Sequence, residues 1–126
     1  MKKNYNERIT KMQKVMNQLL TSEFMKFNQR KNLANKCGIY AIYKNSKIIY
    51  VGYTGNSLKR RFQELMGDYR SHSLHNNLIK KLGNKKRVQN FLISKCRFKV
   101  KEFDNQKEAK IAEHFIIGVV NPKYNS

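Results

Sequence analysis

Glu113 is the carboxylate in this sequence best placed to do chemistry, because it falls on the apolar side of a helical pattern. The residues that form this apolar side are Ala109, Ile111, Ala112, Phe115 and Ile116. An unpaired carboxylate on the buried side of a helix costs several kcal/mol, and a bound divalent cation removes that cost. Mg²⁺ takes only one or two carboxylates together with water and phosphate oxygens. A single glutamate therefore suffices for a metal-assisted reaction at phosphate.

Two histidines, His72 and His75, stand three residues apart in the middle of the chain. Spacing alone does not make them a metal site, because a first-row ion needs three or four ligands and no third ligand follows at a suitable interval. Two cysteines, Cys37 and Cys96, are too few for a disulfide framework or a zinc site. We interpret both cysteines as small, reduced core residues.

Charge points to the partner. The chain has 126 residues, the size of one domain, and carries 27 Lys and Arg against 8 Asp and Glu, a formal net charge of +19. Such an excess predicts a polyanionic partner, with nucleic acid first and an anionic membrane surface second. No apolar run reaches the length of a membrane span, and no signal peptide begins the chain. We therefore expect a cytoplasmic protein that does not enter a membrane.

The central element that must position a site is a β-hairpin followed by a basic helix. Two apolar runs, Gly38 to Tyr43 and Ile48 to Gly52, flank the polar segment from Lys44 to Lys47. Alternation predicts that Tyr40 and Ile42 share one face of the first strand, opposite Ile39, Ala41 and Tyr43. In the second strand, alternation places Ile48 and Tyr50 on one face and Ile49 and Val51 on the other. Taken alone, Tyr40 and Tyr50 are aromatic residues that suit strands.

The next helix separates two neighbouring arginines. Its apolar stripe consists of Leu58, Phe62, Leu65, Met66 and Tyr69. At about 100° per residue, Arg61 lies at the edge of this stripe, whereas Arg60 points away from it. Arg61 can therefore reach toward the hairpin, and we assign Lys59 and Arg60 to contacts with phosphates.

The remaining segments complete the sheet and its cover. Leu74, Leu78 and Leu82 predict a short helix that Ser73 or Asn76 caps and Gly83 ends. Lys85, Lys86 and Arg87 are predicted to form a basic loop that contacts DNA, and residues 84–95 fit either a strand or the end of a helix. A third strand follows, with Cys96, Phe98 and Val100 inward and Arg97, Lys99 and Lys101 outward. Asp104 or Asn105 caps the last helix.

An N-terminal amphipathic helix is predicted from about Tyr5 to about Gln29, with a polar linker over Asn28 to Lys36. Its apolar stripe consists of Ile9, Met12, Met16, Leu19, Leu20, Phe24 and Phe27. This stripe can pack on the domain or form a homodimer contact, and the basic face can follow a phosphate backbone or lie on a membrane. We divide the chain into residues 1–36, the basic helix and linker, and residues 37–126, a catalytic domain.

Four motifs in the right order give the sequence a resemblance to the GIY-YIG nucleases. The two sequence motifs after which the family is named correspond to Gly38-Ile39-Tyr40 and Tyr50-Val51-Gly52. Arg60 or Arg61 corresponds to the family's helix arginine, and the phase of the apolar stripe selects Arg61. Glu113 resembles the metal-binding glutamate, and the segment Asn121 to Asn125 resembles the terminal asparagine motif. The resemblance covers roughly residues 37 to 125.

The resemblance implies a fold and a site. The fold is an α/β (α+β) domain with a three-stranded antiparallel sheet flanked by helices, here with the extra N-terminal helix. Tyr40 and Tyr50 line the active site, where Tyr40 or Tyr50 prepares the attacking water, and Glu113 holds Mg²⁺ or Mn²⁺. Arg61 stabilises the charge that develops on the phosphate. The two glycines, Gly38 and Gly52, and Asn125 support the site, with Gly52 allowing the backbone to approach the scissile phosphate.

His75, followed by Asn76 and Asn77, is similar to a histidine at the start of this helix in homing-type members, which implies an active-site role. Leu65 and Tyr53 depart from the family pattern, which has a second histidine and a lysine at these places. We expect a metal-dependent endonuclease that hydrolyses phosphodiester bonds of double- or single-stranded DNA, a stand-alone enzyme of a phage, mobile element or restriction system. The alternative is a catalytically inactive nucleic-acid-binding protein that retains the fold.

Overall fold

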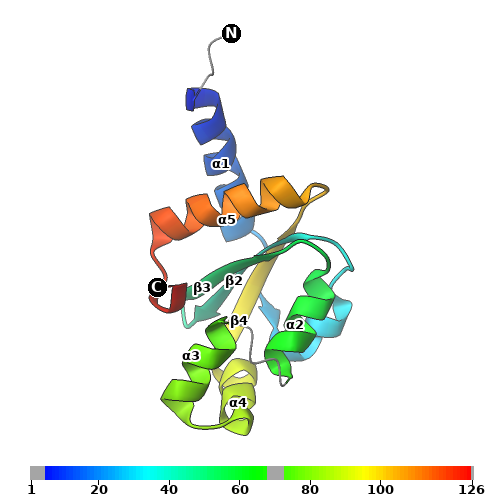
Figure 1. Ribbon diagram of the computed structural model, residues 1–126, viewed down its shortest axis with the longest axis vertical. Helices are drawn as coiled ribbons and strands as arrows, with labels where there is room; N and C mark the ends of the chain where they lie inside the picture. The colour runs from blue at the N-terminus through cyan, green and yellow to red at the C-terminus, as the bar shows by residue number, and fades with distance from the viewer. Residues whose placement is uncertain (1–4, 68–72, 126) are drawn as a thin grey trace.

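The computed structural model describes residues 5–67 and 73–125. Its centre is an antiparallel sheet of four strands in the order β1-β4-β2-β3 (Figure 1). The strands are β1 (Met25–Lys26), β2 (Gly38–Lys44), β3 (Lys47–Thr54) and β4 (Cys96–Glu102). The α+β class and the antiparallel sheet are as predicted, but the count of three strands is wrong. The fourth strand, β1, pairs with β4 and comes from a segment predicted to be helical.

The hairpin of β2 and β3 forms around the predicted turn, with Asn45 in the left-handed region at φ 58°. A register shift between Ile42 and Tyr43 makes the second strand depart from simple alternation. Ile49 is the extra residue, so Ile49 and Tyr50 pack on one face of the sheet, and Ile48 and Val51 on the other. The prediction that Ile48 and Tyr50 share one face of the strand is therefore wrong. Tyr50 lies on the same face of the sheet as Tyr40.

Helices cover both faces of the sheet (Figure 1). On one face α2 (Leu58–Met66), α3 (Ser73–Leu82), α4 (Lys85–Lys95) and the 3₁₀ helix η1 (Phe27–Asn32) enclose a core with Tyr40, Phe62 and Phe98. On the other face α1 (Tyr5–Leu20) and α5 (Gln106–Val120) pack against Ile39, Ala41 and Val51. The chain then turns at Asn121, in the left-handed region at φ 51°, and continues into η2 (Lys123–Asn125).

The N-terminal helix is shorter than predicted. It ends at Leu20 rather than near Gln29, because the chain then enters β1 and η1. Met12, Val15 and Leu19 are buried in the same cluster as Ala109 and Ala112 of α5, so the helix packs on the domain. Ile9, predicted to belong to the buried stripe, is 48% exposed. The division at residue 36 and a homodimer through α1 stay predictions.

Two further expectations about basic residues change. Lys85, Lys86 and Arg87 form the first turn of α4 and not a loop, with Asn84 accepting a hydrogen bond from the Arg87 N–H. Lys99, predicted to point outward, is buried, because α1 covers that face of β4. Its Nζ lies 4.3 Å from the centroid of the Phe24 ring and donates to the carbonyl of Leu20 at 2.5 Å. A lysine there stabilises the carbonyl end of α1.

Candidate active site

Tyr40 and Tyr50, from the two strands of the hairpin, lie on one face of the sheet with ring centroids 6.2 Å apart. Both are buried, and Tyr40 also contacts the Phe62 ring of α2 at 5.1 Å. Burial raises the pKa of the Tyr40 phenol well above its ordinary value of 10.0, Tyr50 raises it further, and the Arg61 guanidinium acts in the opposite direction. Tyr40 therefore stays neutral near pH 7 and serves as a hydrogen-bonding hydroxyl.

Gly52 is glycine because the Tyr40 ring occupies the space of a side chain. The two residues face each other across β2 and β3, and a Cβ atom on Gly52 would stand 2.5 Å from both Cζ and the hydroxyl oxygen of Tyr40. Gly38 has an equally tight environment, since its Cβ would stand 2.5 Å from the Lys101 carbonyl oxygen. Both glycines thus support the packing of the hairpin.

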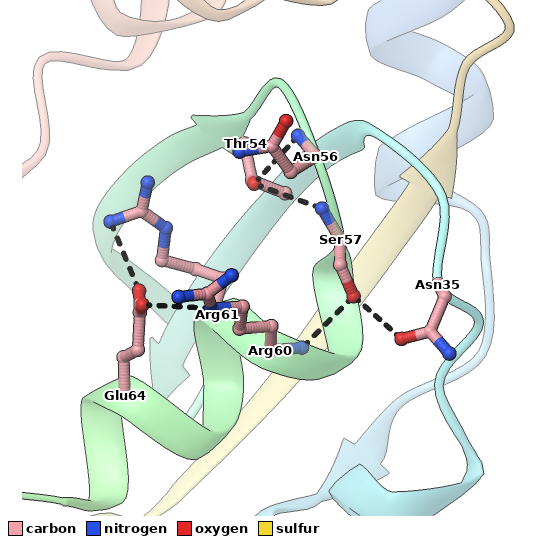
Figure 2. A network of polar contacts seen from close by, with 7 residues as sticks. All are labelled: Asn35, Thr54, Asn56, Ser57, Arg60, Arg61 and Glu64. Carbon is pink, nitrogen blue, oxygen red and sulfur yellow. Dashed lines mark hydrogen bonds and ion pairs between the residues drawn. The ribbon is translucent and has the colours of Figure 1, made fainter.

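Arg61 and Arg60 both meet Glu64, one turn further along α2 (Figure 2). Arg61 Nη1 lies 3.8 Å from a Glu64 carboxylate oxygen, and Arg60 Nε lies 3.5 Å from the other. The Arg60 side chain is 70% exposed, whereas that of Arg61 is 32% exposed. The Arg61 Nε is buried and has no hydrogen-bond partner among the residues that the structure describes. That donor is free to receive an anionic oxygen.

The turn between β3 and α2 fixes the start of the helix that carries Arg61 (Figure 2). Thr54 is buried, and its hydroxyl accepts hydrogen bonds from the N–H groups of Asn56 and Ser57. Ser57 caps α2 by accepting from the Arg60 N–H at 3.1 Å, and its hydroxyl donates to Asn35 at 2.8 Å. Because these hydrogen bonds join the end of β3 to the first turn of α2, they set the direction of α2 relative to the hairpin locally.

Glu113 comes from the opposite layer, where α5 packs against the outer strand β3, and its charge acts on the Tyr40 phenol. Its side chain is 14% exposed, and burial raises the pKa of its carboxyl above the ordinary value of 4.5. Positive charge on Lys110 and Arg61 and a hydrogen bond from the Tyr53 N–H oppose this increase. His114 Nε2 lies 3.6 Å from Glu113 Oε1.

The donor set fits a magnesium-type ion and not a zinc-type ion. No cluster of three His, Cys, Asp or Glu side chains occurs in residues 5–67 and 73–125, so no closed protein cage exists there. A single, partly buried carboxylate whose ionisation is unfavourable gains from a cation at its side. Mg²⁺ binds in this way, with waters and substrate oxygens completing its coordination. Glu113 is therefore the residue that can hold such an ion.

Asn125 returns to the hairpin from the far end of the chain. Its side-chain oxygen accepts from the Val51 N–H at 2.8 Å, and its side-chain nitrogen donates to the Val51 carbonyl at 2.7 Å. The amide thus satisfies both outward backbone groups of one residue on the edge strand β3, as a neighbouring strand does elsewhere. Val51 directly follows Tyr50, so this contact stabilises the part of β3 that carries the site.

His75 lies in the core of the protein. It is fully buried in α3, and its Nδ1 lies 3.3 Å from the carbonyl oxygen of Leu65. Its Nε2 has no hydrogen-bond partner among the described residues. The other histidine, His72, lies outside the described residues. A catalytic role for His75 stays a prediction.

The residues assigned to DNA contacts are spread over two helices. Lys59 and Arg60 are on α2, next to Arg61. Lys85, Lys86 and Arg87 are at the start of α4, at the end of the molecule opposite α1 (Figure 1). Cations at the positive end of a helix do not stabilise that helix, but Arg87 Nη1 also donates to the Leu82 carbonyl at 3.3 Å, at the end of α3.

Two participants were missed by sequence reasoning. Glu64 contacts both arginines, and its spacing of three residues from Arg61 and four from Arg60 was the available signal. The Tyr53 N–H, which hydrogen-bonds Glu113, has no signal in the sequence because a backbone group looks the same at every position.

Across residues 5–67 and 73–125, no helix has both the length and the apolar character that crossing a bilayer demands.

Comparison with known proteins agrees with this arrangement. The family model described as the GIY-YIG catalytic domain matches residues 36–125. Two similar solved structures are of the GIY-YIG N-terminal endonuclease domain of UvrC from Thermotoga maritima. One, a point mutant bound to its catalytic divalent cation, is 17% identical with a TM-score of 0.57, covering 79% of this chain and 92% of that chain. The other, bound to magnesium, is 19% identical with a TM-score of 0.54, covering 79% and 93%. No curated protein matches significantly.

Proposed function

Since the chain belongs to the family of GIY-YIG catalytic domains, we propose that it is a metal-dependent DNA endonuclease. The observation that supports this best is the convergence of four groups from different elements. Tyr50 of the hairpin, Arg61 of α2 and Glu113 of α5 all act electrostatically on the Tyr40 phenol, and Arg61 also acts on Glu113. The net charge of +19 supplies the attraction to DNA.

Glu113 would hold the divalent cation, Mg²⁺ or Mn²⁺. When bound, the ion would polarise the scissile phosphate and offset its negative charge. Glu113 keeps its place for this task through the hydrogen bond from the Tyr53 N–H. A single carboxylate ligand implies weak binding of metal by the free protein and stronger binding once substrate oxygens share the ion.

The two tyrosines would prepare the water. Burial keeps Tyr40 neutral, so we assign it the orientation of the water through its hydroxyl. Tyr50 is the more exposed of the two, at 8% against 1%, and we assign it the role of general base. Its hydroxyl proton passes to solvent, and the phenolate then takes a proton from the attacking water. The hydroxyl adds to phosphorus, the bond to the leaving sugar oxygen breaks, and that oxygen takes a proton from solvent.

Arg61 would stabilise the charge that builds up on the phosphate oxygens. Its buried Nε, which has no partner within residues 5–67 and 73–125, is a donor ready for such an oxygen, and the guanidinium is planar and permanently charged. Glu64 holds the other end of the side chain through Nη1. A loss of this donor should therefore lower the rate far more than the affinity.

The test is cleavage of supercoiled plasmid and of labelled single- and double-stranded oligonucleotides with Mg²⁺, Mn²⁺ or EDTA. We expect cleavage with metal only, and its loss in Glu113→Ala with binding retained. Arg61→Ala and Arg60→Ala form a matched pair, because both arginines contact Glu64 but only Arg61 has the buried Nε. Removing one charge-stabilising donor costs about 10²–10³ in rate, so Arg61→Ala should fall by that factor and Arg60→Ala by little. Equal losses would contradict the assignment of Arg61.

The alternative is a nucleic-acid-binding protein without activity. Leu65 favours it, because this fully buried residue stands where the resemblance leads us to expect a histidine. Tight binding without cutting under any metal would establish it. A setting in a phage, mobile element or restriction system, and a location in the cytoplasm, belong to the proposal on the strength of the resemblance and charge alone.

A further inference from the structure

Three surface hollows on the side of α3 and α4 share lining residues and so form one continuous track. We call this set the basic track. The largest hollow, about 700 Å³, opens between β1, the hairpin turn and the end of α4. A second, about 430 Å³, lies between the hairpin turn, α3 and α4. The third, about 360 Å³, lies between α3 and η2. Asn45 and Lys95 line both the first and the second, and Lys81 lines both the second and the third.

Cations follow the whole track. Lys26, Lys95 and Arg97 line the first hollow, and Lys44 joins Lys95 in the second. Lys80, Lys81 and Lys123 line the third. None of the described residues that line the three hollows is Asp or Glu. A path of one sign of charge along hollowed surface attracts a linear polyanion.

Each hollow also contains one aromatic ring with a lysine near it. Phe24 lines the first hollow and is 44% exposed, with Lys99 Nζ at 4.3 Å from the ring centroid on its buried side. Phe91 lines the second, with Lys44 Nζ at 5.7 Å. Tyr124 lines the third, with Lys81 Nζ at 5.7 Å. Rings placed along a cationic groove are the arrangement on which unpaired bases stack.

The track ends at η2, which lies against β3, the strand that carries Tyr50. Tyr124 precedes Asn125, whose side chain holds Val51 next to Tyr50. At the other end, Phe24 and Lys26 come from the segment before residue 36, outside the part that matches the family model. This chain therefore contributes residues of its own to the far end of the track.

We propose that the basic track binds a single-stranded segment of nucleic acid that continues from the cleavage site, with bases on Phe24, Phe91 and Tyr124 and phosphates on the lysines. The choice of single over double strand follows from the rings, because bases within a duplex are stacked on one another and offer them no free face. This inference rests on the proposed function, cleavage of DNA. It adds that the DNA substrate has an unpaired segment beside the cleavage site.

The experiment measures binding in EDTA, so it does not depend on cleavage. The probes are a fluorescent oligothymidylate of about 20 nucleotides and a duplex of equal length. The first comparison pairs Lys81→Gln/Lys95→Gln with Lys14→Gln/Lys107→Gln on α1 and α5. Both doubles remove two exposed cations, so they differ only in position. We expect the track double alone to weaken single-strand binding and to lower the salt slope by about 1.4, at about 0.7 per phosphate contact.

The second comparison tests the rings. Phe91→Leu and Tyr124→Leu keep apolar volume but remove the stacking face, and Tyr5→Leu is the control because Tyr5 is 67% exposed on α1. Each track variant should lose about tenfold in single-strand affinity with little change for the duplex, and Tyr124→Phe should bind as the wild type does. Equal losses in control and track variants, or equal losses for duplex and single strand, would overturn the proposal. Should a leucine variant fail to fold, as circular dichroism would show, the exposed lysine doubles decide.

Cleavage is the separate readout that distinguishes this inference from the proposed function. A wild type that binds single strands through the track but never cuts would remove the nuclease assignment and leave the track. If the wild type cuts duplex and tailed duplex equally well, and the track variants change neither rate, the nuclease assignment stands and the track is overturned. A Lys81→Gln/Lys95→Gln variant that loses binding to anionic phospholipid vesicles and keeps its binding to oligonucleotides is a further outcome to look for. That result would also overturn the track as a nucleic-acid site.

Discussion

The Tyr40 phenol fills the space above Gly52, so that a Cβ atom on residue 52 would stand 2.5 Å from its hydroxyl oxygen and from Cζ. The glycine of the second motif thus makes room for the tyrosine of the first. The sequence-based reason for Gly52, close approach to a phosphate, is not needed to explain the residue. The two motifs are coupled by packing before any substrate binds.

Gly52→Ala should therefore displace the Tyr40 ring. Forcing an extra carbon into a filled core costs typically about 1–3 kcal/mol, and here the displaced group is a site residue. We expect lower stability by that amount in urea unfolding, together with reduced cleavage. Gly118→Ala is the control, because nothing lies within 4 Å of a Cβ at this exposed position in α5. It should leave activity intact and raise stability by about 0.5–1 kcal/mol; an equal loss in both variants would contradict the coupling.

Asn125→Ala should loosen the edge strand beside Tyr50. It removes two hydrogen bonds to the Val51 backbone, each worth about 0.5–1.5 kcal/mol. We expect faster hydrogen exchange of the Val51 amide and a modest loss of stability. Asn125→Asp keeps the acceptor but loses the donor, so it should rescue only the protection of the Val51 N–H. Unchanged exchange at Val51 in the alanine variant would show that the contact is unimportant in solution.

Glu113→Gln should stabilise the metal-free protein at neutral pH. The pKa of Glu113 is raised by burial, so the folded state favours the protonated carboxyl, and stability is lost as the pH rises through that folded pKa. The thermal midpoint of the variant should exceed that of the wild type at pH 8, with the difference shrinking toward pH 4.5. With DNA already present, added Mg²⁺ should raise the midpoint of the wild type further and leave that of the variant unchanged. A constant difference across this pH range would exclude Glu113 as its source.

Lys99→Met should destabilise the packing of α1 on the sheet. The buried ammonium donates to the Leu20 carbonyl at the end of α1 and lies over the Phe24 ring, and methionine keeps only the apolar part of the side chain. Hydrogen bonds to charged groups contribute about 1.5–3 kcal/mol, so a loss of that order is expected in urea unfolding. Lys14→Met, on the exposed side of α1, is the control. Equal stability of the two variants would contradict the role of Lys99.

Cys96 should be inert in the folded protein. Burial raises the pKa of its thiol to about 12, so almost no thiolate exists at pH 8. In a Cys37→Ser background, we expect Cys96 to react with a thiol reagent only after denaturation. Rapid labelling of the native protein would show that the interior opens more readily than the packing implies.

The sequence by itself determined the parts of the molecule that local rules specify. The turn at Asn45, the end of α3 at Gly83 and a cap for α5 at Asp104 or Asn105 each depend on a few neighbouring residues, and the structure selects Asn105, which accepts from the Lys107 N–H. The helical phase that separates Arg61 from Arg60, and that leaves Glu113 among apolar residues, follows from 3.6 residues per turn. The sequence therefore gave correct faces for α2 and α5.

Only the tertiary structure decided the rest, because those features depend on contacts between distant residues. Strand β1 exists through its pairing with β4, and Lys99 is buried because a helix from the start of the chain covers it. The extra residue at Ile49, which brings Tyr50 to the face of Tyr40, arises from the register of two strands and not from either one. A period of two or 3.6 residues encodes which side of an element is apolar, but not which element comes to lie against it.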